Sequence, residues 1–394
     1  MGNSLAWDLI LRNKGKAGAD DFAGELEGLK GKAKSAAAGI GTALAGAGAV
    51  GAGLLAKGFA DNMSIEVGRD KLNAQLGLSV EDSEKAGRAA ATVYGDNWGA
   101  STDEVNDAIR SVGQNIGDVS KMSEADLTKV TEQALALSST MGTDVALSTE
   151  AVGAMMKNGL AKNSTEAFDI ITAGMQNGVN KADDLLETFQ EYSPQFSKLG
   201  IKGKDALNLL SAGLKAGARD TDVIADAFKE LSIRAIDGSA TSVDAYKTLG
   251  LSAKDTAAEF GKGGDAAREA TQKIMDGLLK IKDPVERNRV GVELFGTQWE
   301  DTVSKILPAL ANARGAVQDV DGATQRMSDT VGDNAAGRIE TAKRKFEQWT
   351  QSMAESDSAL GTVVTGLGAF GGGAVGAATS AATMAQAVRG TALA

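Results

Sequence analysis

The sequence contains neither cysteine nor histidine. Their absence excludes disulfide bonds, zinc sites built from Cys and His, Ser-His-Asp triads and Cys-His nucleophile pairs. Chemistry carried by carboxylates or lysines alone stays open, but no residue pattern supports it. We therefore expect a protein that is not an enzyme and that has no catalytic, cofactor-binding or metal-binding residues.

Proline and aromatic residues are scarce as well. Only Pro194, Pro284 and Pro308 occur, and aromatics make up 4% of the chain. Few positions therefore interrupt a helix from within. Hydrophobic residues reach 43%, much of it alanine, which suits closely packed helices. The composition predicts an all-α fold in which the 49 glycines separate the helices.

Positive charge is in the minority, with 41 Lys and Arg against 52 Asp and Glu, a net charge of -11. This balance argues against a specific nucleic-acid site, because such sites depend on clustered cations. The densest basic run is Lys343-Arg344-Lys345, which we interpret as a solvated helix face. The first residues have neither the charged region nor the apolar run of a signal peptide.

The chain divides into five stretches by character. We expect an N-terminal strand (Leu5–Leu11) and amphipathic helix over 1–34, and a Gly/Ala-rich hydrophobic helix over 35–59. A central domain of many short packed helices follows over 60–320, then a polar connecting helix over 321–358. Residues 359–394 form a second Gly/Ala-rich segment, which we expect to be truncated because the chain stops in mid-pattern.

Helix starts and corners are marked throughout the central domain. Ser79, Ser123 and Ser252 each precede an aspartate by three residues, the spacing of a helix N-cap. The motif Leu-Gly-Leu/Ile, with Asp four residues later, occurs at Gly77, Gly200 and Gly250 and predicts a helix corner. Glycines that we expect to end helices are Gly142, Gly159, Gly178, Gly200, Gly217 and Gly238.

Two weak motifs have simpler explanations. The string Gly46 to Gly51 matches GxGxxG, but no strand precedes it and its surroundings are nearly all Gly and Ala. Asp319, Asp321 and Gly322 suggest a calcium loop without its remaining ligands, and a polar connector explains them better. Trp98, Phe295 and Trp299 are expected in the core.

Several pieces resemble one known family. They are Leu186–Phe189, Leu199–Ile201, Ala206–Gly213, Tyr246–Leu251, Val290–Gly296 followed by Trp299, and Leu307–Leu310. Their order, with a charged helix and a Gly/Ala segment before them, is similar to the N-terminal region of phage tail tape-measure (minor tail) proteins. The resemblance covers about residues 60–320.

The resemblance implies a structural protein of the virion tail lumen that templates tail tube length. It implies contacts with the tail tube protein, tail assembly chaperones and tail-tip or baseplate proteins, and a homo-oligomer in the tail. The protein would stay in the host cytoplasm during assembly. On infection it would be ejected to aid genome passage, with transient host membrane contact.

Length and alternatives qualify this expectation. A wholly helical chain of this length would span only about 590 Å at 1.5 Å per residue, so we expect either a fragment of a longer protein or a short or degraded prophage version. The end of the chain without a helix cap favours the fragment. A stand-alone pore-forming bacteriocin or toxin is the first alternative, and an immunity gene nearby would support it. A tail-associated cell-wall hydrolase is the second, and clearing of peptidoglycan in a gel would support that.

Seven small residues in the two Gly/Ala-rich segments are the candidates for helix packing or membrane contact: Gly41, Ala45, Ala49, Gly53, Gly368, Gly372 and Gly376. Their four-residue spacing lets helix backbones approach closely. Gly41→Leu and Gly372→Leu should therefore reduce tail assembly or infectivity, scored by particle counts and plaque titre. Unchanged assembly and infectivity in both variants would rule this role out.

Overall fold

The computed structural model describes residues 70–332, 337–341, 343–345 and 348. Within these residues every regular element is a helix, which confirms the all-α prediction. The chain divides into two compact units, residues 1–107 with 332–394 and residues 108–331. The predicted N-terminal strand and both Gly/Ala-rich segments lie outside the described residues.

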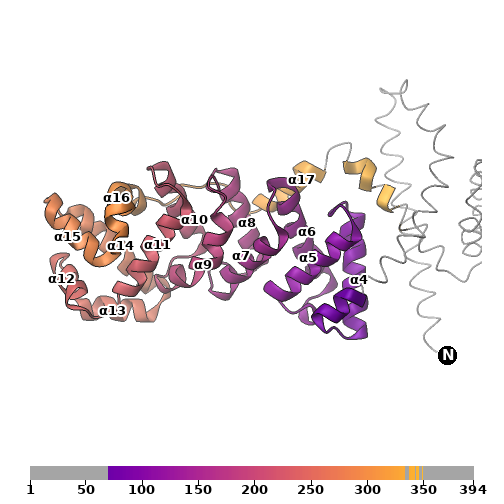
Figure 1. Cartoon of the computed structure of the whole chain (residues 1–394), viewed down its shortest axis with the longest axis horizontal. Coiled ribbons are helices and arrows are strands. Elements are labelled where there is room, and N and C mark those ends of the chain that lie inside the picture. The colour runs from indigo at the N-terminus through magenta and orange to yellow at the C-terminus, as the bar shows by residue number, and fades with distance from the viewer. Residues whose placement is uncertain (1–69, 333–336, 342, 346–347, 349–394) are drawn as a thin grey trace, which may run out of the picture. The chain divides into compact units, whose positions relative to one another are not determined.

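The helices are short and follow one another closely, as predicted for the central domain (Figure 1). The earlier ones are α4 (Val80–Gly95), α5 (Thr102–Asn115), α6 (Glu124–Met141), α7 (Val145–Lys157), α8 (Ser164–Gln176), α9 (Leu185–Lys198) and α10 (Gly203–Lys215). The later ones are α11 (Thr221–Arg234), α12 (Ala240–Thr248), α13 (Ala253–Lys262), α14 (Gly264–Lys280), α15 (Pro284–Phe295), α16 (Ser304–Ala311) and α17 (Ala323–Gly332).

Local sequence signals set the helix boundaries as expected. The Ser79, Ser123 and Ser252 hydroxyls accept the backbone N–H of Asp82, Asp126 and Asp255 at 3.1, 3.1 and 3.3 Å. All the predicted corner and helix-ending glycines have positive φ, which L residues with a Cβ rarely adopt. Capping and glycine corners therefore determine where these helices begin and end.

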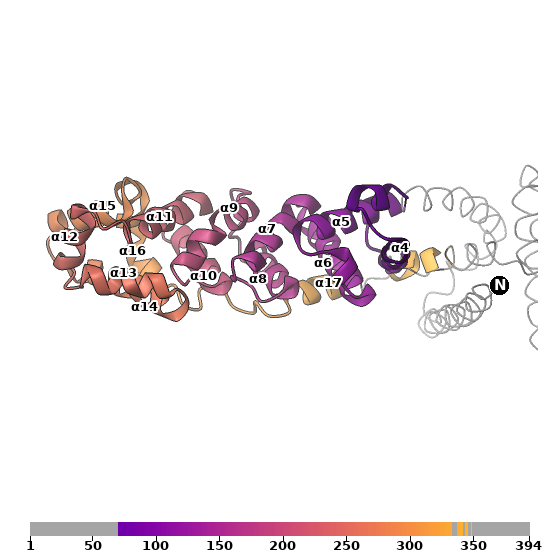
Figure 2. The same ribbon diagram turned by 90° about the horizontal axis from the view of Figure 1, so that it is seen from below.

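In the second unit, alternate helices pack side by side and form two layers. Helices α7, α9, α11 and α15 contact one another in succession, and α6, α8, α10 and α16 do the same. Figure 2 shows α9, α11 and α15 above α8, α10 and α14. Each helix contacts mainly its near neighbours, which is the packing pattern of helical solenoids.

Aromatic and small residues together fill the core of this unit. Phe168, Phe189 and Phe228 are fully buried. Small residues let backbones meet, as predicted from the composition. A Cβ at Gly153 of α7 would lie 2.1 Å from the carbonyl oxygen of Asn115, at the end of α5. The close approach of these two helices therefore requires glycine at position 153.

The segment Leu294-Phe295-Gly296 and the following Trp299 form a tightly packed turn. Helix α15 ends at Gly296, and a π-helical turn (Trp299–Val303) follows. The Trp299 ring folds back onto α15, and its indole N–H donates to Asn288 Oδ1 at 3.1 Å. A Cβ at Gly291 would lie 2.0 Å from this ring. Phe295 and Trp299 are each 1% exposed, which confirms their predicted core positions. Trp98 is only partly buried and is not part of the core, so its predicted core position is wrong.

Because Trp299 covers Gly291, Gly291→Ala should destabilise the fold by about 2 to 3 kcal/mol through overpacking. Gly261→Ala in α13 is the matched control, since no atom lies within 4 Å of its added methyl. The control should gain about 0.5 to 1 kcal/mol from helix propensity. Urea unfolding followed by circular dichroism measures the stability of both variants. Equal unfolding midpoints for Gly291→Ala and the parent would contradict the close packing of Trp299 on Gly291.

Candidate functional site

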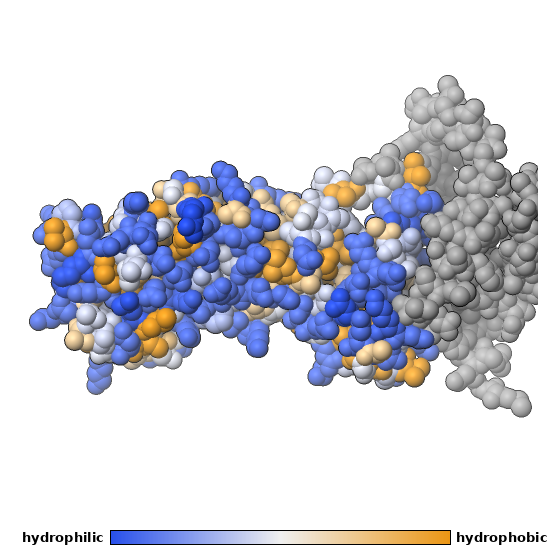
Figure 3. Space-filling view, in the orientation of Figure 1, coloured by the Kyte–Doolittle hydropathy of each residue, from blue (hydrophilic) through white to orange (hydrophobic). Residues whose placement is uncertain are grey.

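The seven predicted packing residues, Gly41, Ala45, Ala49, Gly53, Gly368, Gly372 and Gly376, lie outside the described residues. Among residues that the structure describes, no helix is both long and apolar enough to cross a membrane. On the face seen in Figure 3, hydrophobic residues form small separate patches on a mostly hydrophilic surface. The most distinctive feature of the described residues is instead a set of contacts between distant parts of the chain.

The first contacts hold the return segment, residues 312–322, which connects α16 to α17. In Figure 2 it runs beneath α10 and α8, opposite to the direction of the helix array. The Asn208 side-chain oxygen accepts the backbone N–H of Val317 at 2.9 Å. The Lys215 ammonium donates to the Ala316 carbonyl at 3.1 Å. Side chains of α10 thus replace the backbone partners that this non-helical stretch lacks.

Asp169 in α8 anchors the end of the return segment. Its two carboxylate oxygens accept the backbone N–H groups of Gly322 at 2.8 Å and Thr324 at 3.0 Å. The first N–H groups of a helix have no partner within it, so Asp169 caps α17 from another helix. The Thr172 and Thr324 hydroxyls are hydrogen-bonded at 2.9 Å beside this cap. Asp169 is 6% exposed, so its bonds are shielded from water.

An ion pair at the surface supports the same anchor. The Lys204 ammonium lies 2.6 Å from Asp321 Oδ1 and donates a hydrogen bond that lowers the pKa of this carboxyl. Arg326 donates to the backbone carbonyls of Asp319 and Asp321. Asp321 is largely exposed, so the pair contributes little stability compared with the buried Asp169 cap. The predicted polar connector at Asp319–Gly322 is therefore an attachment point.

A similar arrangement occurs in the other layer, between α9 and α11. Asp184, at the start of α9, accepts the backbone N–H groups of Thr221 at 2.7 Å and Asp222 at 3.0 Å. Both bonds go to one oxygen, Oδ2, so Asp184 caps α11 together with Asp220, which accepts the backbone N–H of Val223. The Thr188 and Thr221 hydroxyls bond at 2.7 Å beside it. Each cap thus combines a carboxylate with a buried pair of threonines.

A further long-range contact lies within the first unit. The Arg344 guanidinium donates to the carbonyls of Tyr94 at 3.2 Å and Gly99 at 2.8 Å. It also lies 4.3 Å from the centre of the Tyr94 ring, within the range of a cation–π interaction. Arg344 is only 8% exposed, so the interpretation of Lys343-Arg344-Lys345 as a solvated face is wrong at its central residue.

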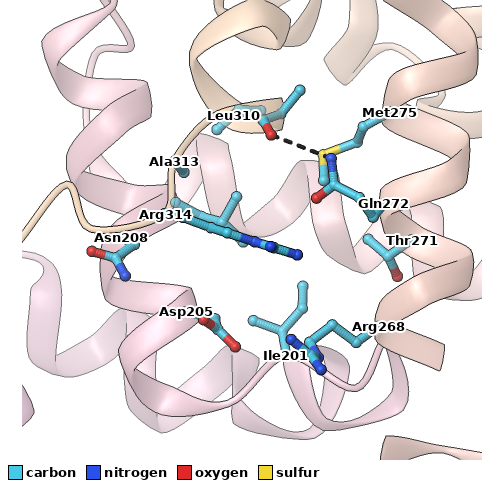
Figure 4. Close-up of a pocket in the computed structure, with 12 residues that line it drawn as sticks. Ile201, Asp205, Asn208, Arg268, Thr271, Gln272, Met275, Leu310, Ala313 and Arg314 are labelled. Carbon is cyan, nitrogen blue, oxygen red and sulfur yellow. Dashed lines mark hydrogen bonds between the residues drawn. The ribbon is translucent and has the colours of Figure 1, made fainter. Parts of the chain in front are cut away.

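A small cavity of about 60 Å³ lies between α10, α14 and the end of α16 (Figure 4). Arg268, Arg314 and Asp205 face it, and Gln272 donates to the Ala311 carbonyl at its rim. The Arg268 Nε is buried without a hydrogen-bond partner. Within the described ranges, no three His, Cys, Asp or Glu side chains are grouped to hold a metal ion. The cavity has room for a few water molecules only.

Sequence reasoning missed Asp169, Asp184 and Arg344. Asp169 gives one signal, because it interrupts the apolar run Phe168, Ile170, Ile171 on a helix that is buried almost all round. A carboxylate in such a place needs donors. The sequence does not indicate which helix supplies them.

Comparison with known proteins places this helical chain in a family. The family described as "Phage-related minor tail protein" matches residues 88–296. A "Probable tape measure protein" of Streptomyces phage phiC31 is 38% identical over 308 residues, which are 78% of this chain and 42% of that protein. The chain thus spans about two fifths of the length of this curated relative. No solved structure matches the chain.

The family match runs from within α4 to the end of α15 and includes the glycine corners at Gly200 and Gly250 and the segment Leu294-Phe295-Gly296. Most of the pieces that carry the sequence resemblance lie in this range, and Trp299 and Leu307–Leu310 lie beyond it. The chain belongs to the phage-related minor tail protein family.

Proposed function

We propose that this chain acts as part of a tape-measure protein, which sets the length of the phage tail tube. The observation that carries the proposal is the 38% identity to a probable tape measure protein over 78% of the chain. The identity is too extensive to arise from alanine-rich composition alone. The tail family match over residues 88–296 supports the same role.

The described structure agrees with a structural role. Its helix ends are capped by nearby side chains and by carboxylates from other helices. Several polar side chains with long-range partners make contacts of this kind. Asp169 and Asp184 bond to backbone N–H groups, and Arg344 bonds to backbone carbonyls. Groups committed to the backbone are not available as acid, base or nucleophile, so the proposed function includes no catalysis.

The proposal places the protein in the virion, in contact with other tail proteins. Its specific partners would be the tail tube protein, the assembly chaperones and the tail-tip or baseplate proteins, with a homo-oligomer in the tail. The Gly/Ala-rich segments at 35–59 and 359–394 would pack against partner helices or contact the host membrane on ejection. Their uncharged Gly/Ala stretches and four-residue spacing of small side chains support this part.

A ruler predicts a fixed gain in tail length for each residue added. A helix-forming insertion of about 70 residues after Met353 should lengthen tails by roughly 105 Å, at 1.5 Å per residue. Negative-stain micrographs of phage that carry the insertion give the length. Intact tails of parental length would contradict the ruler function, whereas a pore-forming toxin predicts no effect on tails of any kind.

A further inference from the structure

In each of the two units, a hydrogen bond joins residues that lie far apart in the sequence. In the second unit, Asp169 bonds to the backbone N–H of Gly322, 153 residues later, at 2.8 Å. In the first unit, Arg344 bonds to the carbonyl of Tyr94, 250 residues earlier, at 3.2 Å. Both contacts involve backbone atoms, so they fix the path of the chain and not only the position of a side chain.

Such a bond limits the distance that the chain between the two bonded residues can span. If residues 169–322 formed one continuous helix, their ends would be about 230 Å apart at 1.5 Å per residue. In the folded unit these ends lie within hydrogen-bonding distance. The same holds for Tyr94 and Arg344, whose separation along a continuous helix would be about 375 Å. Folded in this way, the segment adds almost nothing to the span of the chain.

The closing contacts are also the well-protected ones. Asp169 and Arg344 are 6% and 8% exposed, and the threonine pair beside Asp169 is buried. The two layers enclose large side chains such as Phe168 and Phe228, which opening would expose to water.

From the contact in the second unit we infer that residues 169–322, here termed the closed module, stay folded in the assembled tail and do not contribute to tail length. The inference rests on the proposed ruler function and divides the chain in two. The closed module acts as a folded end piece, and the length is set by other parts of the tape-measure protein. This differs from a ruler in which every residue contributes 1.5 Å.

The absence of cysteine makes the inference testable by cross-linking. Thr172→Cys with Thr324→Cys places two thiols where hydroxyls lie 2.9 Å apart and locks a loop of 152 residues. Thr188→Cys with Thr221→Cys uses hydroxyls 2.7 Å apart and locks a loop of 33 residues. The second pair is a matched control, because it has the same chemistry and burial but encloses far fewer residues.

The locks are closed in the producing cell, in a host with an oxidising cytoplasm or with a short thiol-bridging reagent, and tail lengths are measured by electron microscopy. The closed module predicts parental tail length for both locked variants. Residues that contribute to length would instead give tails shorter by about 230 Å and 50 Å, in proportion to the loop. Loss of tails in the locked form alone would also overturn the inference, because it would show that the module must open.

The insertion after Met353 is measured in the same experiment. Longer tails from the insertion with shorter tails from the Thr172/Thr324 lock would leave the ruler standing and refute the closed module. Tails unchanged in every variant would refute the ruler itself. Longer tails from the insertion with unchanged tails from both locks would support the inference.

Discussion

The architecture of the second unit depends on a buried carboxylate that caps a helix distant in sequence. Asp169 holds the first N–H groups of α17, and through them it ends the return segment against α8. Without this acceptor, the buried N–H of Thr324 and the part-buried N–H of Gly322 would lose their partner, at a cost of about 1 to 3 kcal/mol for a fully buried donor. Asp184 does the same for α11. Helices are thus joined by polar bonds at their ends, α8 to α17 and α9 to α11, as well as by apolar packing between their faces.

Caps supplied by a distant helix satisfy groups that arrays of short helices leave without partners. A row of short helices exposes the apolar face of its last member and leaves many helix ends without partners. Here the chain turns back after α16 and covers α10 and α8 with polar attachments at Asn208, Lys215 and Asp169. These bonds attach the chain after α16 to helices that come much earlier in the sequence.

The sequence predicted the features that depend on neighbours along the chain. Serine caps, glycine corners, short helices and the core position of Trp299 all follow from spacings of a few residues, and the structure confirms them. Asp169 and Arg344 were beyond such reasoning, because their partners lie 153 and 250 residues away. Arg344 also shows why charge alone misleads: its guanidinium is buried among carbonyls and the Tyr94 ring. The candidate packing residues of the Gly/Ala-rich segments lie outside the described residues and stay predictions.

Amide hydrogen exchange in the full chain tests the closing role of Asp169 most directly. Asp169→Ala should leave Gly322 and Thr324 without their acceptor and weaken local protection by about 2 to 4 kcal/mol, or roughly 30- to 1000-fold faster exchange. Asp329→Ala, which removes an exposed carboxylate from α17 itself, should leave these rates unchanged. Equal protection of Gly322 and Thr324 in Asp169→Ala and the parent would contradict the account, because the return segment would then be held by something other than this cap.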